Sequence, residues 1–405
     1  MDLVLRDTLS GSQRAVRRRP GHPLSMYVCG PTVYDAAHVG HARTYLYFDV
    51  VRRFLEAEGV PVRHVMNVTD IEDKIEARAA QLGLTWRALA RREERGFFRD
   101  LAAANILPPH RRPRATEFVP EMIRVVRRLV RTGRVRREGD EWIYSPPPRG
   151  PHENFPTDRQ LAIHAVTEPG HPFPEREGAA GEFMVWKRQA PPKASWPSPW
   201  GRGIPGWHLE CYAMAQKILG IPVDLHGGGH DLIYPHHYAE NEVALQLRGT
   251  AFARVFLHTG FVLIDGGKMS KSTGNLIPLR TALDDVGAAA LRWYLLSIPF
   301  SQRLEWDPAK LHRAAEELAV VRRAVRASLG PSVRGRGTAA SIRRLAGGIR
   351  KELAAGLSTD RAFARLHSWA EGIQESPSTR VSADERTAAR QEFRSIEERT
   401  GLSLL

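Results

Sequence analysis

The amino-acid sequence predicts an α/β fold with a parallel sheet, followed by an all-α C-terminal region. A strand-like run, a helical stripe and a second strand-like run follow one another within residues 25–70, as in a βαβ unit. A strand, a glycine turn and a helix start recur at 223–237. From Asp307 onward, apolar residues recur at helical spacing. At 405 residues, the chain is long enough for two or three domains.

Residue spacing marks the first three elements. The run SMYVCG predicts a short buried strand that ends at Gly30. Helical spacing begins at His41 and Gly59 ends it, with apolar positions at Tyr45, Phe48, Val51 and Leu55. The run VRHVMNVTD (62–70) predicts the next strand and completes the βαβ unit.

The middle of the chain is less regular. A helix is expected around 117–131, closed by Gly133. The stretch 145–206 is rich in Pro, Gly and Trp, and it predicts an insertion with little regular structure. The run VFLHTGFVLIDGGKMSKS, which starts at Val255, predicts another strand before a Gly-Gly turn.

The C-terminal region follows a helical pattern. One stripe precedes a breaker at Gly330-Pro331, and its members are Leu311, Leu318, Val321, Val325 and Leu329. Ser382 and Glu385 form a capping-box pattern, which predicts the start of a last helix containing Phe393 and Ile396.

Composition narrows the class of protein. A hydrophobic content of 42% and 26% charged residues are typical of a soluble protein. No apolar run approaches the roughly 18 residues of a membrane span, and no signal-peptide core is present. With only two cysteines there is no disulfide framework, so we expect a cytoplasmic protein without a membrane partner. The net charge of +14 suits a polyanionic partner, but arginine-rich usage explains it equally well.

Two motifs indicate phosphate chemistry. His38-Val-Gly-His41 joins a strand to a helix start, where backbone N–H groups and the helix dipole favour an anionic phosphate. Lys268 and Lys271 lie in the Gly-flanked, Ser-rich stretch GKMSKSTGN, and mobile ammonium groups can neutralise a phosphate during its transfer. Alone, the first could be a chance match and the second a surface turn. Together on a βα framework they predict nucleotide chemistry.

These motifs and the sequences around them resemble the cysteinyl-tRNA synthetase family (cysteine–tRNA ligases) of class I aminoacyl-tRNA synthetases. The similar segments are YVCGPTVYD, GHARTY, NVTDIEDKI, PRATEFVPEMI, SWPSPWGRGIPGWHLEC, LHGGGHDLIYPHH and GKMSKSTGN, and the resemblance covers roughly residues 1–310. It implies a class I synthetase Rossmann-type parallel sheet with an inserted connective region, followed by an all-α helical bundle. The implied ranges are 1–115 and 201–295 for the two halves of the catalytic domain, 116–200 for the insertion and 296–405 for the bundle.

The resemblance also implies one zinc ion per chain, which ligates the thiol of the substrate. The implied ligands are Cys29, Cys211, His236 and Glu240. Zinc prefers thiolate, imidazole and carboxylate ligands, and the last two residues lie four apart on one helix face. His237 is a neighbouring candidate, but its i+4 position is Asn241, a poor ligand. Without the resemblance, the cysteines could equally be buried apolar residues.

The implied activity is activation of L-cysteine with ATP-Mg²⁺ and transfer of the cysteinyl group to the 3′ end of tRNA(Cys). A metal–thiol bond would reject serine and alanine better than size alone, so no editing domain is expected. The implied catalytic residues are His38, His41, Lys268 and Lys271. The residues implied at the nucleotide are Gly40, His226, Gly228 and Lys271. The residues implied around the amino acid are Gly30, Thr69, Trp207 and Asp231, with the last suited to the ammonium group.

Some features depart from the family pattern. Tyr212 and His230 stand where the family commonly has Ser, and Tyr238-Ala239 replaces a Glu-Asn pair. The length predicts a short form without the C-terminal anticodon-binding domain, and we expect a monomer.

The short length keeps an alternative open. The related cysteine ligase of mycothiol biosynthesis has the same zinc pocket and a similar length, and it transfers cysteine to the amine of a glucosaminyl-inositol. The motif sequences favour tRNA, contacted through its acceptor arm, whereas the length favours the small amine. A non-catalytic RNA-binding relative is a third hypothesis, against which the intact motifs argue.

Overall fold

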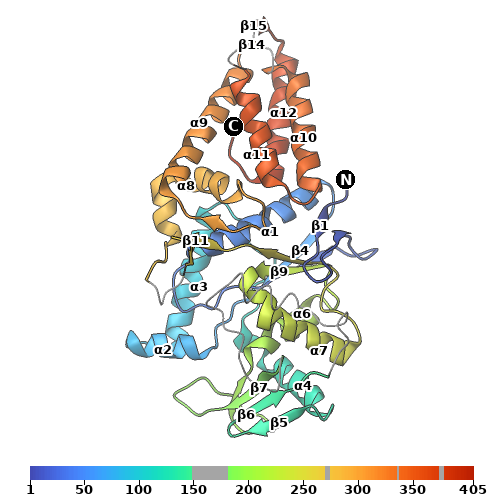
Figure 1. Ribbon diagram of the computed structural model, residues 1–405, viewed down its shortest axis with the longest axis vertical. Helices are drawn as coiled ribbons and strands as arrows, with labels where there is room; N and C mark the ends of the chain where they lie inside the picture. Colours follow the sequence, from blue (N-terminus) through green and yellow to red (C-terminus); the bar gives the residue numbers. More distant parts are fainter. Residues whose placement is uncertain (148–180, 270–273, 335–336, 374–377) are drawn as a thin grey trace.

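A four-stranded parallel sheet forms the centre of the catalytic region (Figure 1). The structure, a computed structural model, describes residues 1–147, 181–269, 274–334, 337–373 and 378–405. The strand order is β10-β9-β3-β4, and every neighbouring pair is parallel. The strands are β3 (Leu24–Val28), β4 (Val62–Met66), β9 (Leu225–Gly229) and β10 (Phe256–Thr259). The predicted α/β class is confirmed.

Helix α1 (Val39–Ala57) makes the crossover between β3 and β4. Its stripe buries Phe48, Val51 and Leu55 against the core, as the spacing predicts. Figure 1 shows α1 between the sheet and the C-terminal helices. The helix begins before the predicted His41 because the His38 side chain caps it by accepting from the His41 N–H.

The segment after β4 is helical and leads into the predicted insertion at 116–200. It contains α2 (Asp73–Gln81), α3 (Trp86–Ala103), the 3₁₀ turn η1 (Ala115–Phe118) and α4 (Val119–Val130). An antiparallel sheet then follows in the order β5 (Val135–Glu138), β6 (Glu141–Tyr144), β7 (Phe183–Arg188) and β8 (Gly203–Pro205).

The expectation of little regular structure over 145–206 is therefore wrong at β7 and β8. Phe183, Val185 and Trp186 are buried in the sheet. A Cβ atom at Gly203 would overlap the carbonyl oxygen of Lys187, so this glycine permits close strand pairing. Part of the Gly- and Trp-rich composition thus serves packing in a sheet.

The second half of the catalytic region returns to the parallel sheet. It contains η2 (Trp207–Leu209), α6 (Glu210–Ile218), η3 (His230–Leu232), the short helical turn η4 (Ile233–His237) and α7 (Tyr238–Arg248). Strands β11 (Val262–Ile264), β12 (Gly267–Lys268) and β13 (Leu304–Glu305) form a separate three-stranded sheet.

The C-terminal region is a helical bundle, as predicted, with a small hairpin at its far end (Figure 1). Its helices are α8 (Leu279–Leu296), α9 (Pro308–Ser328), α10 (Ala339–Ala354), α11 (Thr359–Glu371) and α12 (Ala383–Thr400). The hairpin pairs β14 (Ser332–Arg334) with β15 (Ser378–Arg380), and the N-terminal hairpin pairs β1 (Val4–Arg6) with β2 (Gln13–Ala15). The capping box of Ser382 and Glu385 is confirmed. Within the described ranges, no helix combines the length and apolar character needed to cross a bilayer.

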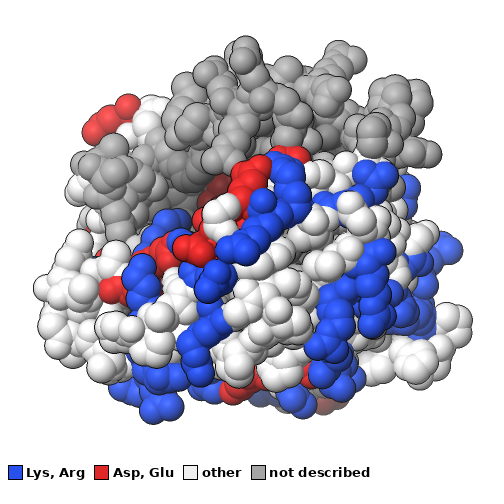
Figure 2. Space-filling model, turned by 90° about the horizontal axis from the view of Figure 1, so that it is seen from below, with Lys and Arg blue, Asp and Glu red and all other residues white. Residues whose placement is uncertain are grey.

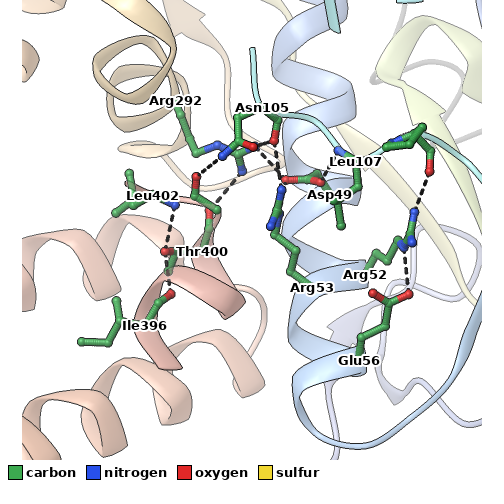
Figure 3. Close-up of polar contacts among 12 residues, drawn as sticks. Asp49, Arg52, Arg53, Glu56, Asn105, Leu107, Arg292, Ile396, Thr400 and Leu402 are labelled. Carbon is green, nitrogen blue, oxygen red and sulfur yellow. Dashed lines mark hydrogen bonds and ion pairs between the residues drawn. The ribbon is translucent and has the colours of Figure 1, made fainter. Parts of the chain in front are cut away.

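A buried ion pair joins the bundle to α1 (Figure 3). Asp49 of α1 lies 2.7 Å from Arg292 of α8, and both side chains are almost fully buried. Arg53 donates to the same carboxylate from the next turn of α1, at 2.8 Å. We call Asp49, Arg53, Arg292 and Asn105 the junction cluster.

The four domain ranges given above remain predictions.

Candidate active site and metal centre

Four elements bring the predicted metal ligands together. Cys29 follows β3 at the carboxyl edge of the sheet, where ligand sites of open α/β folds form. Cys211 lies in the first turn of α6, His236 in η4 and Glu240 in the first turn of α7. Each of these four side chains is at least 96% buried, and their ligand atoms all lie within 4.8 Å of one another.

The separations between the ligand atoms fit a tetrahedral ion. The two sulfur atoms are 3.6 Å apart, and Cys29 Sγ is 3.7 Å from Glu240 Oε1. His236 Nε2 lies 3.4 Å from Cys211 Sγ and 3.0 Å from Glu240 Oε1. Zinc bonds of about 2.0–2.3 Å at tetrahedral angles require separations of roughly 3.3–3.8 Å. Three of these four separations lie in that range, and the His236–Glu240 pair is closer, at 3.0 Å. The four residues therefore suit zinc in both chemistry and geometry.

The charges in this cluster are strongly coupled. Burial opposes ionisation of Glu240, but His236 and His226 outweigh it and hold the pKa of Glu240 well below its usual range. Burial likewise opposes the charged form of His236, but Glu240 and Cys211 raise its pKa to about 10.

The pKa values of the two thiols are shifted in opposite directions. Burial and the neighbouring Cys211 raise the pKa of Cys29. Burial also acts to raise the pKa of Cys211, but the hydrogen bond from Cys29 and the charge on His236 lower it to about 7. A divalent cation would take the place of the protons that this cluster otherwise holds.

A second layer of histidines lies beneath the ligands. His226 Nε2 is 2.8 Å from Glu240 Oε2, and its Nδ1 is 3.0 Å from the carbonyl of Tyr27. His237 lies 3.3 Å from Cys29 Sγ and 2.7 Å from His258. Cys29, His226, His237 and Glu240 could thus also surround an ion. This alternative contains one thiol instead of two.

Sequence reasoning named His226 for the nucleotide and His237 as a metal-ligand candidate, but it did not predict this layer and missed His258. The signal was the strand register, because His226 pairs across the sheet with Tyr27 on one side and Phe256 on the other. His258 lies two residues further along the same edge strand. Parallel strands end at one edge, so the register brings these rings under the residue that follows β3.

Three predicted residues lie away from the pocket surface. His226 was expected at the nucleotide, but it is fully buried and both of its ring nitrogens contact protein atoms. Gly228 was also expected there, yet it packs beside Cys29, and its neighbour Gly229 lines the pocket. Thr69 was expected at the amino acid, but it is buried and donates to Glu210 at 2.8 Å.

We call Cys29, Cys211, His236 and Glu240 the metal cluster. A cavity of about 470 Å³ opens beside it. The predicted residues that line it are Cys29, Gly30, His38, Gly40, His41, Trp207 and Asp231. The indole of Trp207 stacks on the His236 ring with centroids 4.4 Å apart, which holds that imidazole in orientation.

Two glycines are required for the shape of the cavity. A Cβ atom at Gly30 would overlap the carbonyl oxygen of Asn67. A Cβ atom at Gly40 would lie 3.0 Å from the His38 ring and 3.2 Å from Met269. A side chain at either position would displace the turns that border the cavity.

The two signature motifs approach each other at the start of α1. The rings of His38 and His41 stack with centroids 3.7 Å apart. We call the stretch GKMSKSTGN (267–275) the lysine loop. The segment after it pairs with this turn, because Val39 N donates to Ile277 O at 3.1 Å and Leu279 N donates to Ala37 O at 2.8 Å. The backbone of Lys268 lies in β12, whereas Lys271 lies outside the described residues.

Comparison with known proteins agrees with this geometry. The model of the family described as tRNA synthetases class I (C) catalytic domain matches residues 16–316. The chain belongs to this family. The predicted family, fold and enzyme class, an ATP-dependent aminoacyl-tRNA ligase, are therefore confirmed.

Individual relatives point the same way. The chain is 40% identical over 332 residues to the Cysteine–tRNA ligase of Anaeromyxobacter sp. (strain K), covering 79% of this chain and 68% of that protein. The Cysteine–tRNA ligase of Anaeromyxobacter dehalogenans (strain 2CP-1) is equally similar. Among solved structures, Mycobacterium tuberculosis methionyl-tRNA synthetase bound by methionyl-adenylate shares the fold at a TM-score of 0.66 and 19% identity, covering 94% of this chain and 92% of that one.

Proposed function

We propose that this protein activates L-cysteine with ATP to cysteinyl-adenylate and transfers the cysteinyl group to the 3′ end of tRNA(Cys). The observation that carries the proposal is the buried group of two thiols, one imidazole and one carboxylate beside a cavity bordered by the His38–His41 turn. Membership of the class I (C) family and the named relatives support the same activity.

The four ligands are proposed to select the substrate. Cys29, Cys211, His236 and Glu240 would hold zinc, which supplies a coordination position that accepts a thiol and accepts a hydroxyl or methyl poorly. Trp207 keeps the His236 ring in place by stacking. Asp231 lines the same cavity and would pair with the ammonium group of the amino acid.

The activation step uses the part of the cavity that the His38–His41 turn lines. The cysteine carboxylate attacks the α-phosphate of ATP-Mg²⁺, and pyrophosphate leaves. His38 and His41 would donate hydrogen bonds to the phosphate oxygens as charge develops, and the absence of a side chain at Gly40 leaves room for that approach. Lys268 and Lys271 are proposed to neutralise the leaving group. A ribose hydroxyl of the tRNA then attacks the activated carbonyl, and AMP leaves.

The charge distribution suits a nucleic-acid acceptor. Figure 2 shows basic side chains outnumbering acidic ones over the described part of the face that carries α4 and the β5–β8 sheet in Figure 1. The arginines exposed there include Arg124, Arg127, Arg128, Arg131 and Arg137. Binding of an RNA backbone to such a surface should weaken with a log–log salt slope of about −0.7 to −0.9 per phosphate contact.

The test has two stages. Purified protein is first assayed for ATP–pyrophosphate exchange with cysteine, serine or alanine. Exchange with cysteine alone supports the activation step, and equal rates with serine would exclude a thiol-selective site. The protein is then offered tRNA(Cys), a minihelix that carries only the acceptor arm, and a glucosaminyl-inositol. Charging of RNA supports the proposed acceptor, whereas salt-insensitive ligation to the amino sugar would replace it.

A further inference from the structure

Arg43 is a buried cation whose partners are backbone carbonyls. Its side chain comes from the first turns of α1 and is fully buried. It donates to the carbonyl oxygens of Phe261 at 2.8 Å, Gln302 at 2.6 Å and Pro299 at 3.3 Å. In the described ranges, no carboxylate lies within ion-pair distance of it. A buried guanidinium is costly to maintain without an acid, so its three carbonyl bonds call for a specific explanation.

The three carbonyls belong to two segments that cross at this point. Gly260 N donates to Phe300 O at 2.7 Å, and Leu304 N donates to Phe261 O at 2.9 Å. A Cβ atom at Gly260 would overlap the carbonyl oxygen of Gln302, so the two backbones touch directly. Beyond the crossing they continue as the parallel pair β11 and β13. Arg43 therefore ties both segments to α1.

One of these segments leads to the lysine loop. Strand β11 starts next to Phe261 and turns into β12, which ends at Lys268. On its far side, the chain returns to α1 through the hydrogen bonds of Ile277 and Leu279 with residues 37–39. The described residues on the two sides of the lysine motif, 265–269 and 274–276, are thus each attached to the start of the helix that carries His38 and His41. One attachment is backbone pairing, and the other depends on the Arg43 side chain.

We propose that Arg43 is a positioning residue. It sets the placement of the β11–β12 hairpin, which ends at Lys268, relative to His38 and His41. The inference rests on the proposed function, because it assigns the residue a part in cysteine activation. The planar guanidinium presents several donors in a fixed fork, which a lysine ammonium cannot reproduce. A displacement of the loop by about 1 Å would lower the rate on the order of 100-fold, since the loop acts only through its distance from the phosphates.

Arg292 provides a matched control. It is also buried, and it also donates to backbone carbonyls, those of Thr400 at 3.0 Å and Asn105 at 2.6 Å. It lies in the junction cluster and does not line the active-site cavity. Arg43→Lys and Arg292→Lys both retain a buried cation and lose the guanidinium fork, so they share the structural cost of the substitution.

The experiment compares the two variants in cysteine-dependent pyrophosphate exchange. Arg43→Lys is expected to lower kcat on the order of 100-fold while zinc content and the KM for cysteine stay near wild type. Arg292→Lys is expected to keep kcat within about threefold, measured per folded molecule. If the wild-type protein shows no exchange, the proposed function fails. If the wild-type protein shows exchange and the kcat values of Arg43→Lys and Arg292→Lys are similar to each other, whether both high or both low, only the positioning role is overturned.

A double-mutant cycle separates positioning from a general structural role. In a Lys268→Ala background, Arg43→Lys should add less than about a threefold loss, because the group that it positions is already absent. A full additional 100-fold loss in that background would overturn the proposal. Gly260→Ala tests the same crossing with Arg43 intact, and it should reproduce the fall in kcat even if Arg43→Lys fails to fold. Normal kcat in Gly260→Ala would count against the positioning role.

Discussion

The metal cluster and the junction cluster are both buried groups of charged side chains, but they differ in what completes them. Asp49 and Glu240 are almost fully buried carboxylates, and each faces cationic or ring partners. In the junction, protein donors surround the carboxylate (Figure 3). In the metal cluster, atoms that carry lone pairs face one another.

The junction closes on itself. The Asp49 carboxylate accepts from Arg53 at 2.8 Å, from Leu107 N at 2.9 Å and from Arg292 at 2.7 Å. The two terminal nitrogens of Arg292 also donate to carbonyls of Thr400 and Asn105, whereas its buried Nε has no hydrogen-bond partner in the described part of the chain. One carboxylate lies between two guanidiniums, and backbone carbonyls accept from both arginines, so protein atoms alone partner the charged groups of this site.

The metal cluster does not close in this way. Two sulfur atoms lie 3.6 Å apart, and a carboxylate oxygen approaches one of them at 3.7 Å. The pKa values of the two thiols are shifted in opposite directions, upward for Cys29 and downward for Cys211. Convergent electron-pair donors around one point are what a cation requires. The contrast shows how a buried charged group that holds a fold differs from one that binds a ligand.

The largest expected effect follows from breaking the metal cluster. Wild-type protein should contain about one zinc per chain, and Cys211→Ser should lose most of it because one of two thiolate ligands is gone. Cysteine-dependent exchange should fall by well over 100-fold, since even partners outside the ligand set typically matter 10- to 100-fold. Metal analysis of the purified variants checks this. Stoichiometric zinc in a Cys29→Ser/Cys211→Ser double variant would rule out the assignment.

The lysine loop should affect the reaction without affecting the metal. Lys271→Ala is expected to lower cysteine-dependent exchange about 100- to 1,000-fold, the usual loss for removing one stabiliser of developing charge. Zinc content and cysteine binding measured without ATP should stay unchanged. Equal damage to cysteine binding and to exchange would show that the loop supports the structure instead of the phosphate step.

The sequence alone predicted some strands and helices of the fold and missed others. Short apolar runs predicted β3 and β4, which are buried at nearly every position, whereas helical spacing predicted α1 and a capping box predicted the last helix. The sequence did not predict β7 and β8, where glycines allow close backbone approach and weaken the alternating pattern. Composition cannot distinguish a glycine that bends a loop from one that lets strands pack.

The site shows the same limit. Cys29 and Cys211 are 182 residues apart, and only the family resemblance joined them before the structure did. His226 was assigned to the nucleotide because a glycine turn follows it. Its actual place under Glu240 depends on the register of three strands, which no local pattern contains. The role of Lys271 remains a prediction.

Breaking the junction cluster should cost stability and leave the chemistry intact. Asp49→Asn leaves Arg292 buried without a full countercharge, which should lower the free energy of unfolding by about 3–5 kcal/mol. Asp49→Asn/Arg292→Met removes both charges and should recover part of that loss. Denaturant unfolding measures the first effect, and exchange activity per folded molecule measures the second. Loss of zinc from the folded Asp49→Asn variant would show that the two clusters are not independent.

The smallest expected effect concerns pH and a second contact between α1 and the bundle. Burial opposes ionisation of Glu58 at the end of α1, but hydrogen bonds from Arg350, the Met1 amino group and Arg399 lower its pKa to about 2. Because the folded pKa lies below the unfolded value of about 4.3, this contact stabilises the protein fully above roughly pH 5 and is lost as the pH falls toward 2.

Glu58→Gln should therefore lower the free energy of unfolding at pH 7 by about 1–2 kcal/mol, a value reduced by solvent around the partly exposed Arg350. The difference between variant and wild type should shrink steadily between pH 5 and pH 2. Zinc release should come at a higher pH, because protons compete directly for thiolate and imidazole ligands. Chemical unfolding and a chromogenic zinc chelator, followed over the same pH series, give the two curves. A Glu58→Gln difference that stays constant from pH 7 to pH 2 would mean that the carboxylate charge does not contribute to this contact.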